Sequence, residues 1–548
     1  MATTKESAMI ESFKLDSKVT FGIVALLVLY RTLSVIKELK SVGFLPGLRC
    51  IFEPFTFLGA LTPASYGNPG LNFQWSLRTT LYKKYGSDTI SIVPYVWGST
   101  KIWTSNLEVA KQVVSGGPGS SWIKPKEYSK ALLLFGMNIA AAEGNEVWRR
   151  HRRIMGPAFN NKTYKLVWDE SQRVYKDMIE KEGWMSKSII EMPVVQKYTF
   201  KFALSIIARC GFGLPFSWDE PIVEKDGSMS LQESLRLVSE NNLARTSAPK
   251  WFWKLPIQKY QIVDSAFKSL DTFMHAQVSR RKQEIRKEII ENGFADSAKN
   301  DVFSRLVLAS ESEGEKLPLD DQELIGNVFV VLFAGHETSG HTLAATLGFL
   351  GIYQEEQEAI YEQIMEVVGD GRDPNFEDYS SLYKVLAAFY EALRLIPAGS
   401  VMIRETTKDT TLSIPRSSDK EGATSLPVLK NTIVCVDMVG VQYNPRYFTD
   451  PMEFRPSRWY AQETSDIADS FTAFSVGPRA CIGRKFATTE AVCWLSMLLR
   501  DFKVEVIMEP GESKQQARDR VLQAQMVMTL AVNPVPIRLI RRTSITKA

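Results

Sequence analysis

Residues 324–350 constrain the fold most, because apolar residues cover nearly the whole circumference of the helix that they predict. A helix that is apolar on all sides is buried in the core of a large protein. The chain has 548 residues, 45% of them apolar, so it is long enough to bury such a helix in one large unit. We therefore predict a central core helix over 324–350.

Helical patterns dominate residues 143–391 around this segment. Short runs rich in β-branched and aromatic residues predict strands at 89–94, 101–103, 411–414 and 432–436. Polar segments interrupt these patterns near 219–227, 293–300 and 417–422. The fold class that we predict is mainly α with a small, discontinuous β portion (α+β).

Polar residues occupy the middle of the predicted core helix, in the motif AGHETS that begins at Ala334. Gly335 removes side-chain bulk from one face, and the Thr338 hydroxyl can donate to the Ala334 carbonyl and loosen a turn. A groove lined by this hydroxyl and the Glu337 carboxylate is a plausible place to hold dioxygen and relay protons. For the motif alone, a bend in a core helix without chemistry is an equally good interpretation.

A zinc site of the His-Glu-x-x-His type is excluded in the same helix. His341 follows His336 by five residues, which places the two side chains about 140° apart around the helix. The four-residue spacing of the zinc motif leaves only about 40°. The two imidazoles therefore cannot easily share one ion.

A loop from Phe474 to Arg484, with the sequence FSVGPRACIGR, places a single cysteine before an apolar, helix-like run at 486–499. Unpaired N–H groups and the positive end of the dipole at a helix start favour a thiolate, so we expect Cys481 to be a metal ligand. Gly477 and Gly483 are expected to let the backbone turn tightly and approach a flat cofactor. For a cysteine with random neighbours, a buried structural role would be the default.

Two further charge patterns mean little when each is taken alone. Trp148 and Arg152 are four residues apart, so an indole N–H and a guanidinium on one helix face can reach one carboxylate. The cationic run around them is equally typical of a solvated face or of a contact with anionic lipid. Glu391 and Arg394 are three apart on another predicted helix, and Arg458 lies in a proline-bracketed loop. An exposed pair of this kind contributes only a few tenths of a kcal/mol.

Together, and in their order along the chain, the motifs resemble those of the cytochrome P450 family, in its microsomal, fungal-like class of haem-thiolate monooxygenases. The resemblance covers about residues 74–541. It implies haem b bound between the long central helix and the cysteine-loop helix, with Cys481 as the thiolate ligand of the iron. The cofactor-binding positions of the family then fall on Cys481, Trp148, Arg152, Arg404, Phe474, Gly477, Arg479, Gly483, Ala334 and Gly335.

The resemblance also assigns roles to the remaining motifs. Thr338, assisted by Glu337, would be the catalytic group that delivers protons during oxygen activation. Glu391, Arg394 and Arg458 would form a buried ionic triad that holds the scaffold of the cysteine loop; Ser457 stands where the family often has glutamate, outside the triad. The substrate pocket would include Phe135, Phe333, Val401 and Met526 among its apolar lining residues.

The expected reaction inserts one oxygen atom from O2 into a lipophilic small molecule, such as a terpenoid, sterol or fatty acyl compound. No Gly-x-Gly-x-x-Gly fingerprint is present, so electrons must come from outside the chain. The resemblance implies NADPH acting through a flavoprotein reductase, with cytochrome b5 as a second candidate donor. The reductase would dock near Arg149, Arg150, Arg484 and Lys485. A haem-thiolate isomerase or dehydratase and a non-enzymatic haem-binding sensor are the alternatives.

The N-terminal 44 residues contain an apolar run at 19–30 that Arg31 interrupts. Spanning a bilayer takes about 20 apolar residues, so the run suffices only if flanking cations reach the interfaces. A secretory signal is the alternative, but no small-residue cleavage site follows the run. We predict a single uncleaved membrane anchor and hinge over 1–44 and one catalytic domain over 45–548. The sequence Leu45-Pro46-Gly47, which follows the anchor, is typical of a hinge. A second apolar stretch, 52–61, can rest on the membrane surface.

Location and partners follow from the anchor and from composition. The resemblance implies the endoplasmic reticulum membrane, with the catalytic domain facing the cytosol. Five scattered cysteines suit a reducing compartment better than a disulfide framework. The 66 basic and 62 acidic side chains nearly cancel, which gives no indication of a nucleic-acid partner.

Overall fold

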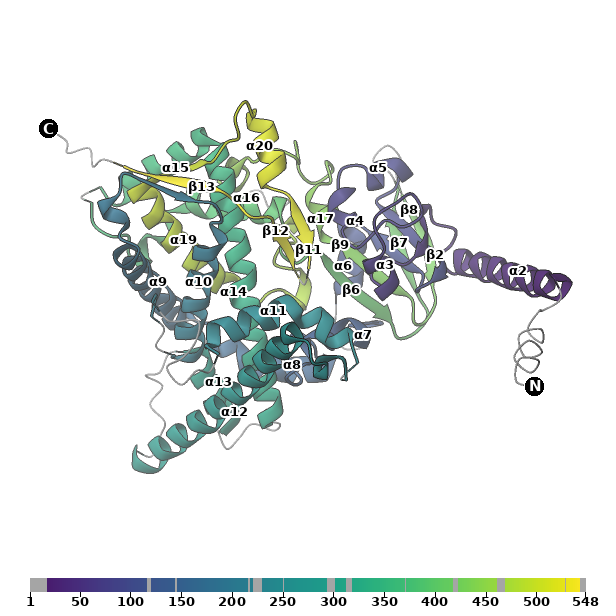
Figure 1. Ribbon diagram of the computed structural model, residues 1–548, viewed down its shortest axis with the longest axis horizontal. Helices are drawn as coiled ribbons and strands as arrows, with labels where there is room; N and C mark the ends of the chain where they lie inside the picture. The colour runs from purple at the N-terminus through teal and green to yellow at the C-terminus, as the bar shows by residue number, and fades with distance from the viewer. Residues whose placement is uncertain are drawn as a thin grey trace, which may run out of the picture.

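The computed structural model is mainly helical, with small sheets at one end and along one side (Figure 1). This agrees with the predicted α+β class. The residues that it describes are 17–115, 120–142, 145–214, 217–219, 229–249, 251–292, 301–311, 318–369, 371–416, 422–460, 469–527 and 529–542. The predicted polar segments at 219–227, 293–300 and 417–422 fall almost entirely outside these residues.

One end of the molecule is built on a six-stranded sheet with the order β1-β2-β3-β9-β6-β4. Pairs β1–β2 and β3–β9 are parallel, and the other neighbours are antiparallel. The strands are β1 (Gly47–Phe52), β2 (Thr89–Trp97), β3 (Lys101–Thr104), β4 (Trp122–Ile123), β6 (Val401–Thr406) and β9 (Ile433–Asp437). A hairpin of β7 (Thr410–Pro415) and β8 (Ala423–Val428) lies beside it. The strands predicted from the sequence are therefore confirmed.

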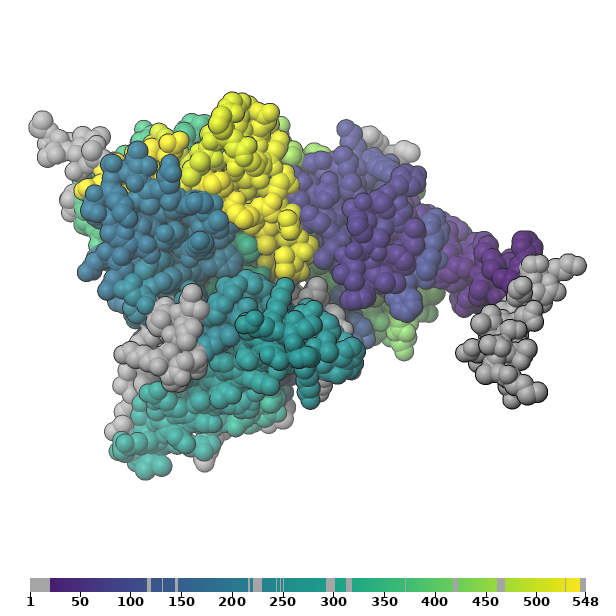
Figure 2. Space-filling view, viewed as in Figure 1, coloured from purple at the N-terminus to yellow at the C-terminus, as the bar shows by residue number. Residues whose placement is uncertain are grey.

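Short helices surround this sheet, and one long helix leaves it (Figure 1). They are α2 (Ser17–Ser41), α3 (Phe57–Leu61), α4 (Phe73–Ser76), α5 (Leu81–Tyr85), α6 (Leu107–Val114), α7 (Lys126–Ser129) and α17 (Met438–Gln442). By length and composition α2 can cross a membrane, and Thr20–Ser41 form the candidate span. In Figure 2 these N-terminal segments gather at one end, and the C-terminal segment lies between them and the helical body.

The helical body surrounds α14 (Asp321–Ile352), which includes the predicted core helix (Figure 1). Asp320 and Glu323 form a capping box at its start. Most of its side chains are buried, as the all-round apolar pattern predicts. The surrounding helices are α8 (Asn145–Met155), α9 (Asn161–Lys181), α10 (Gln196–Ile206), α11 (Leu231–Ser247), α12 (Gln258–Asn292), α13 (Val302–Glu311), α15 (Gln354–Val367), α16 (Tyr383–Leu395), α19 (Arg484–Asp501) and α20 (Lys514–Val521).

Two smaller sheets complete the described fold. One has the order β10-β13-β5, from β10 (Phe502–Val506), β13 (Ile537–Arg541) and β5 (Ile189–Met192). The other pairs β11 (Ala524–Met526) with β12 (Leu530–Val532). All five cysteines are free thiols, as their scatter in the sequence predicts.

The hinge predicted at 45–47 was wrong. Gly47 begins β1 and pairs with Ser91 of β2. The Pro46 carbonyl accepts from the Ser91 amide at 2.8 Å, and the Leu45 carbonyl accepts from the Ser91 hydroxyl at 2.7 Å. A Pro-Gly pair is typical of a turn, but here the carbonyls of Leu45 and Pro46 accept hydrogen bonds from Ser91 of β2, so the segment is fixed.

Candidate functional site

A cavity of about 450 Å³ lies between the middle of α14 and the loop that precedes α19, and β6 and α8 close its sides. Val330, Val331 and Ala334 of α14 and Val401 of β6 give it mainly apolar walls. Cys481, Arg152 and Thr338 all line it, although they are far apart in the sequence. The structure therefore brings the three main motifs together in one cavity.

The loop that carries Cys481 is shaped by its own backbone contacts. The amide of Cys481 donates to the Phe474 carbonyl at 2.8 Å, which closes the loop. Gly477 has φ +75°, and a Cβ there would lie 3.0 Å from the Val114 carbonyl oxygen, so glycine is needed as predicted. Gly483 has φ −85°, which other residues also adopt, so its backbone conformation does not require glycine; the predicted close approach to a flat cofactor stays a prediction.

The ionisation of Cys481 also differs from the expectation. The N–H of Gly483 and the charges of Arg152 and Arg484 lower the pKa of the thiol, but burial outweighs them and raises it. Packing of the surrounding chain raises the pKa of the Cys481 thiol more than these groups lower it, although part of the side chain is open to the cavity. A cysteine in such a place loses its proton when it binds a metal cation.

Cationic side chains line one part of the cavity. Trp148 and Arg152 come from α8, Arg404 from β6 and Arg479 from the cysteine loop. The Arg479 guanidinium lies 5.1 Å from the centre of the Trp148 ring and donates to the Ala142 carbonyl at 2.7 Å. Burial lowers the pKa of Arg404 to about 10, with a smaller effect of the Arg479 charge, and burial also lowers that of Arg479 to about 10.

Lys124 is a cation of this cavity that the sequence did not reveal. Its ammonium donates to the Ala140 carbonyl, and burial, together with the charges of Arg404 and Arg479, lowers its pKa to about 7. No motif marks Lys124, which follows the short strand β4. Among the described residues that line the cavity, Glu490 is the only acidic one. Bringing these buried positive charges together is therefore unfavourable in free energy, and a bound anion would lower that free energy.

On α14, the Thr338 hydroxyl donates to the Ala334 carbonyl at 2.8 Å, as predicted. Ala334, Gly335 and Thr338 line the cavity. A Cβ on Gly335 would lie 2.8 Å from Cγ1 of Ile207, which follows α10, so the missing side chain lets α10 approach α14.

Glu337 lies elsewhere than the predicted groove. It is not among the residues that line the cavity, and its Oε1 accepts from the Thr529 hydroxyl at 2.9 Å. Burial raises the pKa of Glu337 to about 7. The prediction that the Thr338 hydroxyl and the Glu337 carboxylate line one groove on α14 was therefore wrong, because neighbouring helical residues point about 100° apart.

Glu490 of α19 is, after Lys124, the second cavity residue that sequence reasoning missed. It lines the cavity and is 1% exposed. Burial raises the pKa of Glu490 to about 8, and a contact with Ser339 of α14 lowers it only slightly. The cavity wall thus contains a carboxyl group that is protonated at neutral pH. Its sequence neighbourhood, an ordinary helix, gave no signal of this burial.

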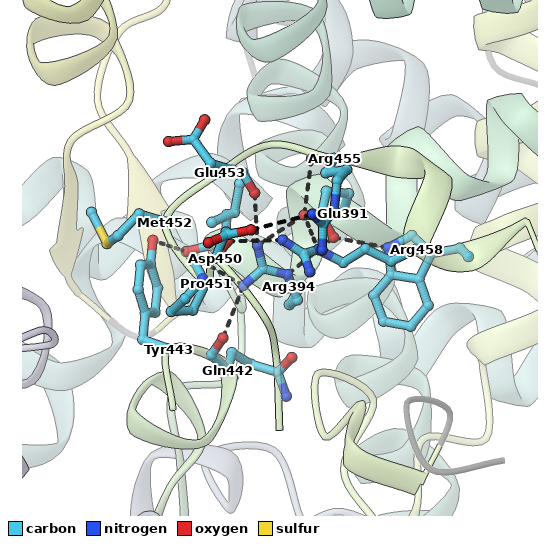
Figure 3. Close-up of polar contacts among 12 residues, drawn as sticks. Glu391, Arg394, Gln442, Tyr443, Asp450, Pro451, Met452, Glu453, Arg455 and Arg458 are labelled. Carbon is cyan, nitrogen blue, oxygen red and sulfur yellow. Dashed lines mark hydrogen bonds and ion pairs between the residues drawn. The ribbon is translucent and has the colours of Figure 1, made fainter. Parts of the chain in front are cut away.

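The three charged residues predicted as a triad meet in one buried cluster (Figure 3). Glu391 Oε1 accepts from Nη2 of Arg394 at 2.8 Å and from Nε of Arg458 at 2.9 Å. Its Oε2 accepts from Nε of Arg394 at 3.0 Å and from the Trp459 indole at 2.9 Å. The remaining N–H groups of Arg394 donate to the carbonyls of Gln442, Pro451 and Glu453.

Aromatic rings connect this cluster to the cysteine loop. Trp459, which binds Glu391, lies 4.8 Å from the ring of Phe471, and Phe471 lies 6.0 Å from Phe474. Tyr390, next to Glu391 on α16, contacts both phenylalanines. Since the Phe474 carbonyl holds the Cys481 amide, the cluster and the loop share one packed unit.

The predicted pocket-lining residues divide into two groups. Val401 lines the cavity. Phe135 and Phe333 are buried in the core, where the rings of both contact Phe329. Met526 lies in β11, and its sulfur accepts from the Ser400 hydroxyl.

These features fit a haem. Its macrocycle is apolar, its two propionates are anionic, and its iron takes an axial thiolate in one class of haem proteins. The cavity offers apolar walls, a group of cations with lowered pKa values, and one thiol whose exposed surface faces inward. Residue types and placement both match the requirements of this cofactor.

Comparison with known proteins gives consistent matches. The family model for cytochrome P450 matches residues 72–530. The chain is 32% identical to cytochrome P450 monooxygenase 124 of Postia placenta, over 91% of this chain and 94% of that protein. It is 26% identical to a cytochrome P450 monooxygenase of Arthrobotrys oligospora, over 87% of each chain. The crystal structure of the cytochrome P450DA haem domain superposes with a TM-score of 0.68 at 19% identity, covering 91% of this chain and 99% of that one.

Proposed function

The chain belongs to the cytochrome P450 family of haem-thiolate monooxygenases, and from this premise we propose that it oxidises a lipophilic small molecule of terpenoid, sterol or fatty acyl type. The observation that carries the proposal is the convergence of Cys481, the cations and the apolar walls on one cavity. An apolar wall favours an apolar substrate, because burying its surface supplies the binding energy.

The residues of the cavity divide the work of holding the cofactor. Cys481 would be the thiolate ligand, and Trp148, Arg152, Arg404, Arg479 and Lys124 would bind the propionates. When bound, the haem supplies the activation of O2 and the transfer of one oxygen atom. The aromatic unit of Tyr390, Phe471 and Phe474 would hold the cysteine loop in position.

Thr338 would move protons at the cavity wall. Its hydroxyl donates to the Ala334 carbonyl, and rotation about the Cβ–Oγ1 bond would turn the same hydrogen away from that carbonyl toward the cavity. Glu337, with a pKa of about 7, can take up and release protons at neutral pH, which suits a group that resupplies Thr338. One oxygen atom of O2 would enter the substrate, and the other would leave as water.

Electrons would come from NADPH through a membrane-bound flavoprotein reductase, with cytochrome b5 as a second donor. Arg484 and Lys485, next to the cysteine loop, support docking of an acidic partner there. Arg150 suits this role less well than expected, because it pairs with Glu323. We assign the chain to the endoplasmic reticulum membrane, with α2 as its single anchor and the catalytic domain in the cytosol.

The test is the carbon monoxide difference spectrum of the reduced protein, with Cys481→Ala as the variant and Cys50→Ala as a matched control. We expect the red-shifted Soret band of a thiolate ligand in the wild type and the control, and its loss in Cys481→Ala. A wild type without that band would overturn the haem-thiolate assignment.

Product formation from candidate substrates is then measured with and without NADPH and reductase. Turnover without them would favour an isomerase or dehydratase. Ligand binding without any turnover would favour a sensor.

A further inference from the structure

Glu337 is a buried carboxyl group that has one hydrogen-bond partner among the described residues. It is 6% exposed. Its Oε1 accepts from the Thr529 hydroxyl at 2.9 Å, whereas Oε2 is buried and accepts from none of the described groups. A buried oxygen without a partner is unfavourable while it carries negative charge. Oε2 is therefore the atom of Glu337 that gains most from binding a proton.

The Thr529 hydroxyl makes the two oxygens of this carboxyl group unequal. A donor at Oε1 stabilises negative charge on that oxygen, so the proton of the neutral form goes to Oε2. Burial raises the pKa of Glu337 to about 7, and the Thr529 hydroxyl lowers it. Glu337 thus gains and loses a proton near neutral pH, and its contact with Thr529 selects the oxygen at which it does so.

Thr529 lies between β11 and β12, and backbone bonds hold this hairpin in place. The amide of Leu530, which begins β12, donates to the Ala398 carbonyl at 2.9 Å. The side chain of Asn72 bonds to two backbone groups of β11, at 3.1 and 3.2 Å. Figure 1 shows the hairpin in yellow beside α14, which β12 contacts. The position of the Thr529 hydroxyl relative to α14 is therefore fixed by the fold.

The same hairpin is bonded to a wall of the cavity. Ala398, which accepts from β12, lines the cavity, and the nearby Ser400 hydroxyl donates to the sulfur of Met526 in β11. On the other side, Thr338 follows Glu337 on α14 and also lines the cavity. Thr529 itself is not among the lining residues, so it can act on the cavity only through Glu337.

Burial and the Thr529 hydroxyl are the two influences on the pKa of Glu337. The other titratable groups of this part of α14 are His336 and His341, and burial lowers the pKa of both, so both are neutral at pH 7. Burial raises the pKa of Glu490, on the neighbouring helix α19, to about 8, so it too is neutral. Thr529 is thus the one polar group of the described residues that orients this carboxyl group.

We propose that Thr529 is a positioning residue for proton supply to the cavity: its hydroxyl fixes Oε1 of Glu337, so that Oε2 is the oxygen that exchanges protons with Thr338. This inference rests on the proposed roles of Glu337 and Thr338. A carboxyl group held by one oxygen presents the other in one orientation, whereas a carboxyl group without this bond turns about its own axis. Positioning of this kind is what makes a proton donor effective.

Infrared spectroscopy of the holoenzyme tests the contact itself. The carbonyl stretching band of the protonated Glu337 side chain is followed from pH 5 to pH 9, and Glu337→Gln identifies the band, since Glu490 also keeps a proton in this range. Thr529→Val removes the hydroxyl at nearly constant volume, so the midpoint should rise. Thr529→Ser should restore it. Thr411→Val, the same change at an exposed position of β7, is the matched control.

The products of oxygen reduction test the role in proton supply. O2 that takes up two electrons and two protons without transferring an oxygen atom leaves as hydrogen peroxide. The peroxide released per NADPH consumed is measured with the reductase and the substrate that the product assay identifies. We expect this ratio to rise several-fold in Thr529→Val and in Glu337→Gln, and to stay at the wild-type value in Thr529→Ser and Thr411→Val.

The outcomes separate this inference from the proposed function. An unchanged midpoint in Thr529→Val would overturn the contact, and a raised midpoint with an unchanged peroxide ratio would overturn its role in proton supply. An unchanged ratio in Glu337→Gln would instead overturn the proposed role of Glu337. The thiolate Soret band reports whether each variant is folded, and Thr529→Ala replaces Thr529→Val where the latter loses the band.

Discussion

Glu391→Gln tests whether the buried charge cluster stabilises the fold as its geometry implies. The carboxylate accepts from five donors, three at Oε1 and two at Oε2. A glutamine amide in either orientation turns an N–H group toward at least two of these donors. It also leaves the guanidinium groups of Arg394 and Arg458 buried without a counter-ion. Removing one partner of a buried ion pair costs about 3–5 kcal/mol.

The free energy of unfolding is measured in urea on the holoprotein, and the thiolate Soret band is followed as a second signal. Glu453→Gln is the matched control, because the Glu453 side chain lies in the same segment but is 56% exposed. It should change stability by less than about 0.5 kcal/mol. We expect Glu391→Gln to lose both stability and the Soret band.

Where Glu391→Gln yields no folded protein, Arg458→Lys provides the measurement. Lysine keeps the charge but cannot reproduce the bonds of Arg458 to the carbonyls of Thr449 and Asp450. The loss of unfolding free energy in Arg458→Lys should be larger than in Glu453→Gln and smaller than in Glu391→Gln. Equal stability of Glu391→Gln and Glu453→Gln would refute the reasoning, because it would mean that the buried pair contributes no more than an exposed carboxylate.

Three further predictions concern the cavity. Burial raises the pKa of Glu490 to about 8, so the folded state keeps a proton that the unfolded state loses above about pH 4.5, and this group lowers the unfolding free energy by about 1.4 kcal/mol per pH unit between these two values. Glu337 and Lys124 also titrate in this range, so the test is the difference between two proteins: the unfolding free energy of the wild type, measured from pH 6 to pH 8, should fall more steeply than that of Glu490→Gln by about this amount. Lys124→Met should accelerate haem transfer to apomyoglobin, and an unchanged rate would argue against Lys124 as a propionate ligand. Gly335→Val should destabilise the α10–α14 contact by about 1–3 kcal/mol through its clash with Ile207, and thermal unfolding would detect it.

The elements that the sequence predicted well are those whose signal is local or repeated along the chain. The core helix is apolar on every side, so its burial requires no knowledge of its neighbours. Gly477 is needed for its own φ and for the approach of Val114, and a glycine-punctuated loop indicates such a need. The triad was predicted through its resemblance to known motifs, because a pair such as Glu391 and Arg394 says nothing about burial by itself.

Lys124 and Glu490 were missed because their roles depend on tertiary placement. Each is an ordinary charged residue in its own segment, and only the packing of β4 and α19 around the cavity removes their water. The same cause explains Cys481, whose pKa was expected to fall. The helix-start effect is local and visible in the sequence, whereas the burial that outweighs it comes from distant segments.

The position of Glu337 could have been predicted, since helix geometry alone decides it. Ala334 and Thr338 are four residues apart and share a face, as their hydrogen bond at 2.8 Å confirms. Glu337 precedes Thr338 by one residue, so it must point about 100° away from that face. Its bond to Thr529 is the result, and the carboxylate can reach the cavity only through Thr338 or a water molecule. Any proton path from Glu337 therefore needs the Thr338 hydroxyl or a bridging water as an intermediate.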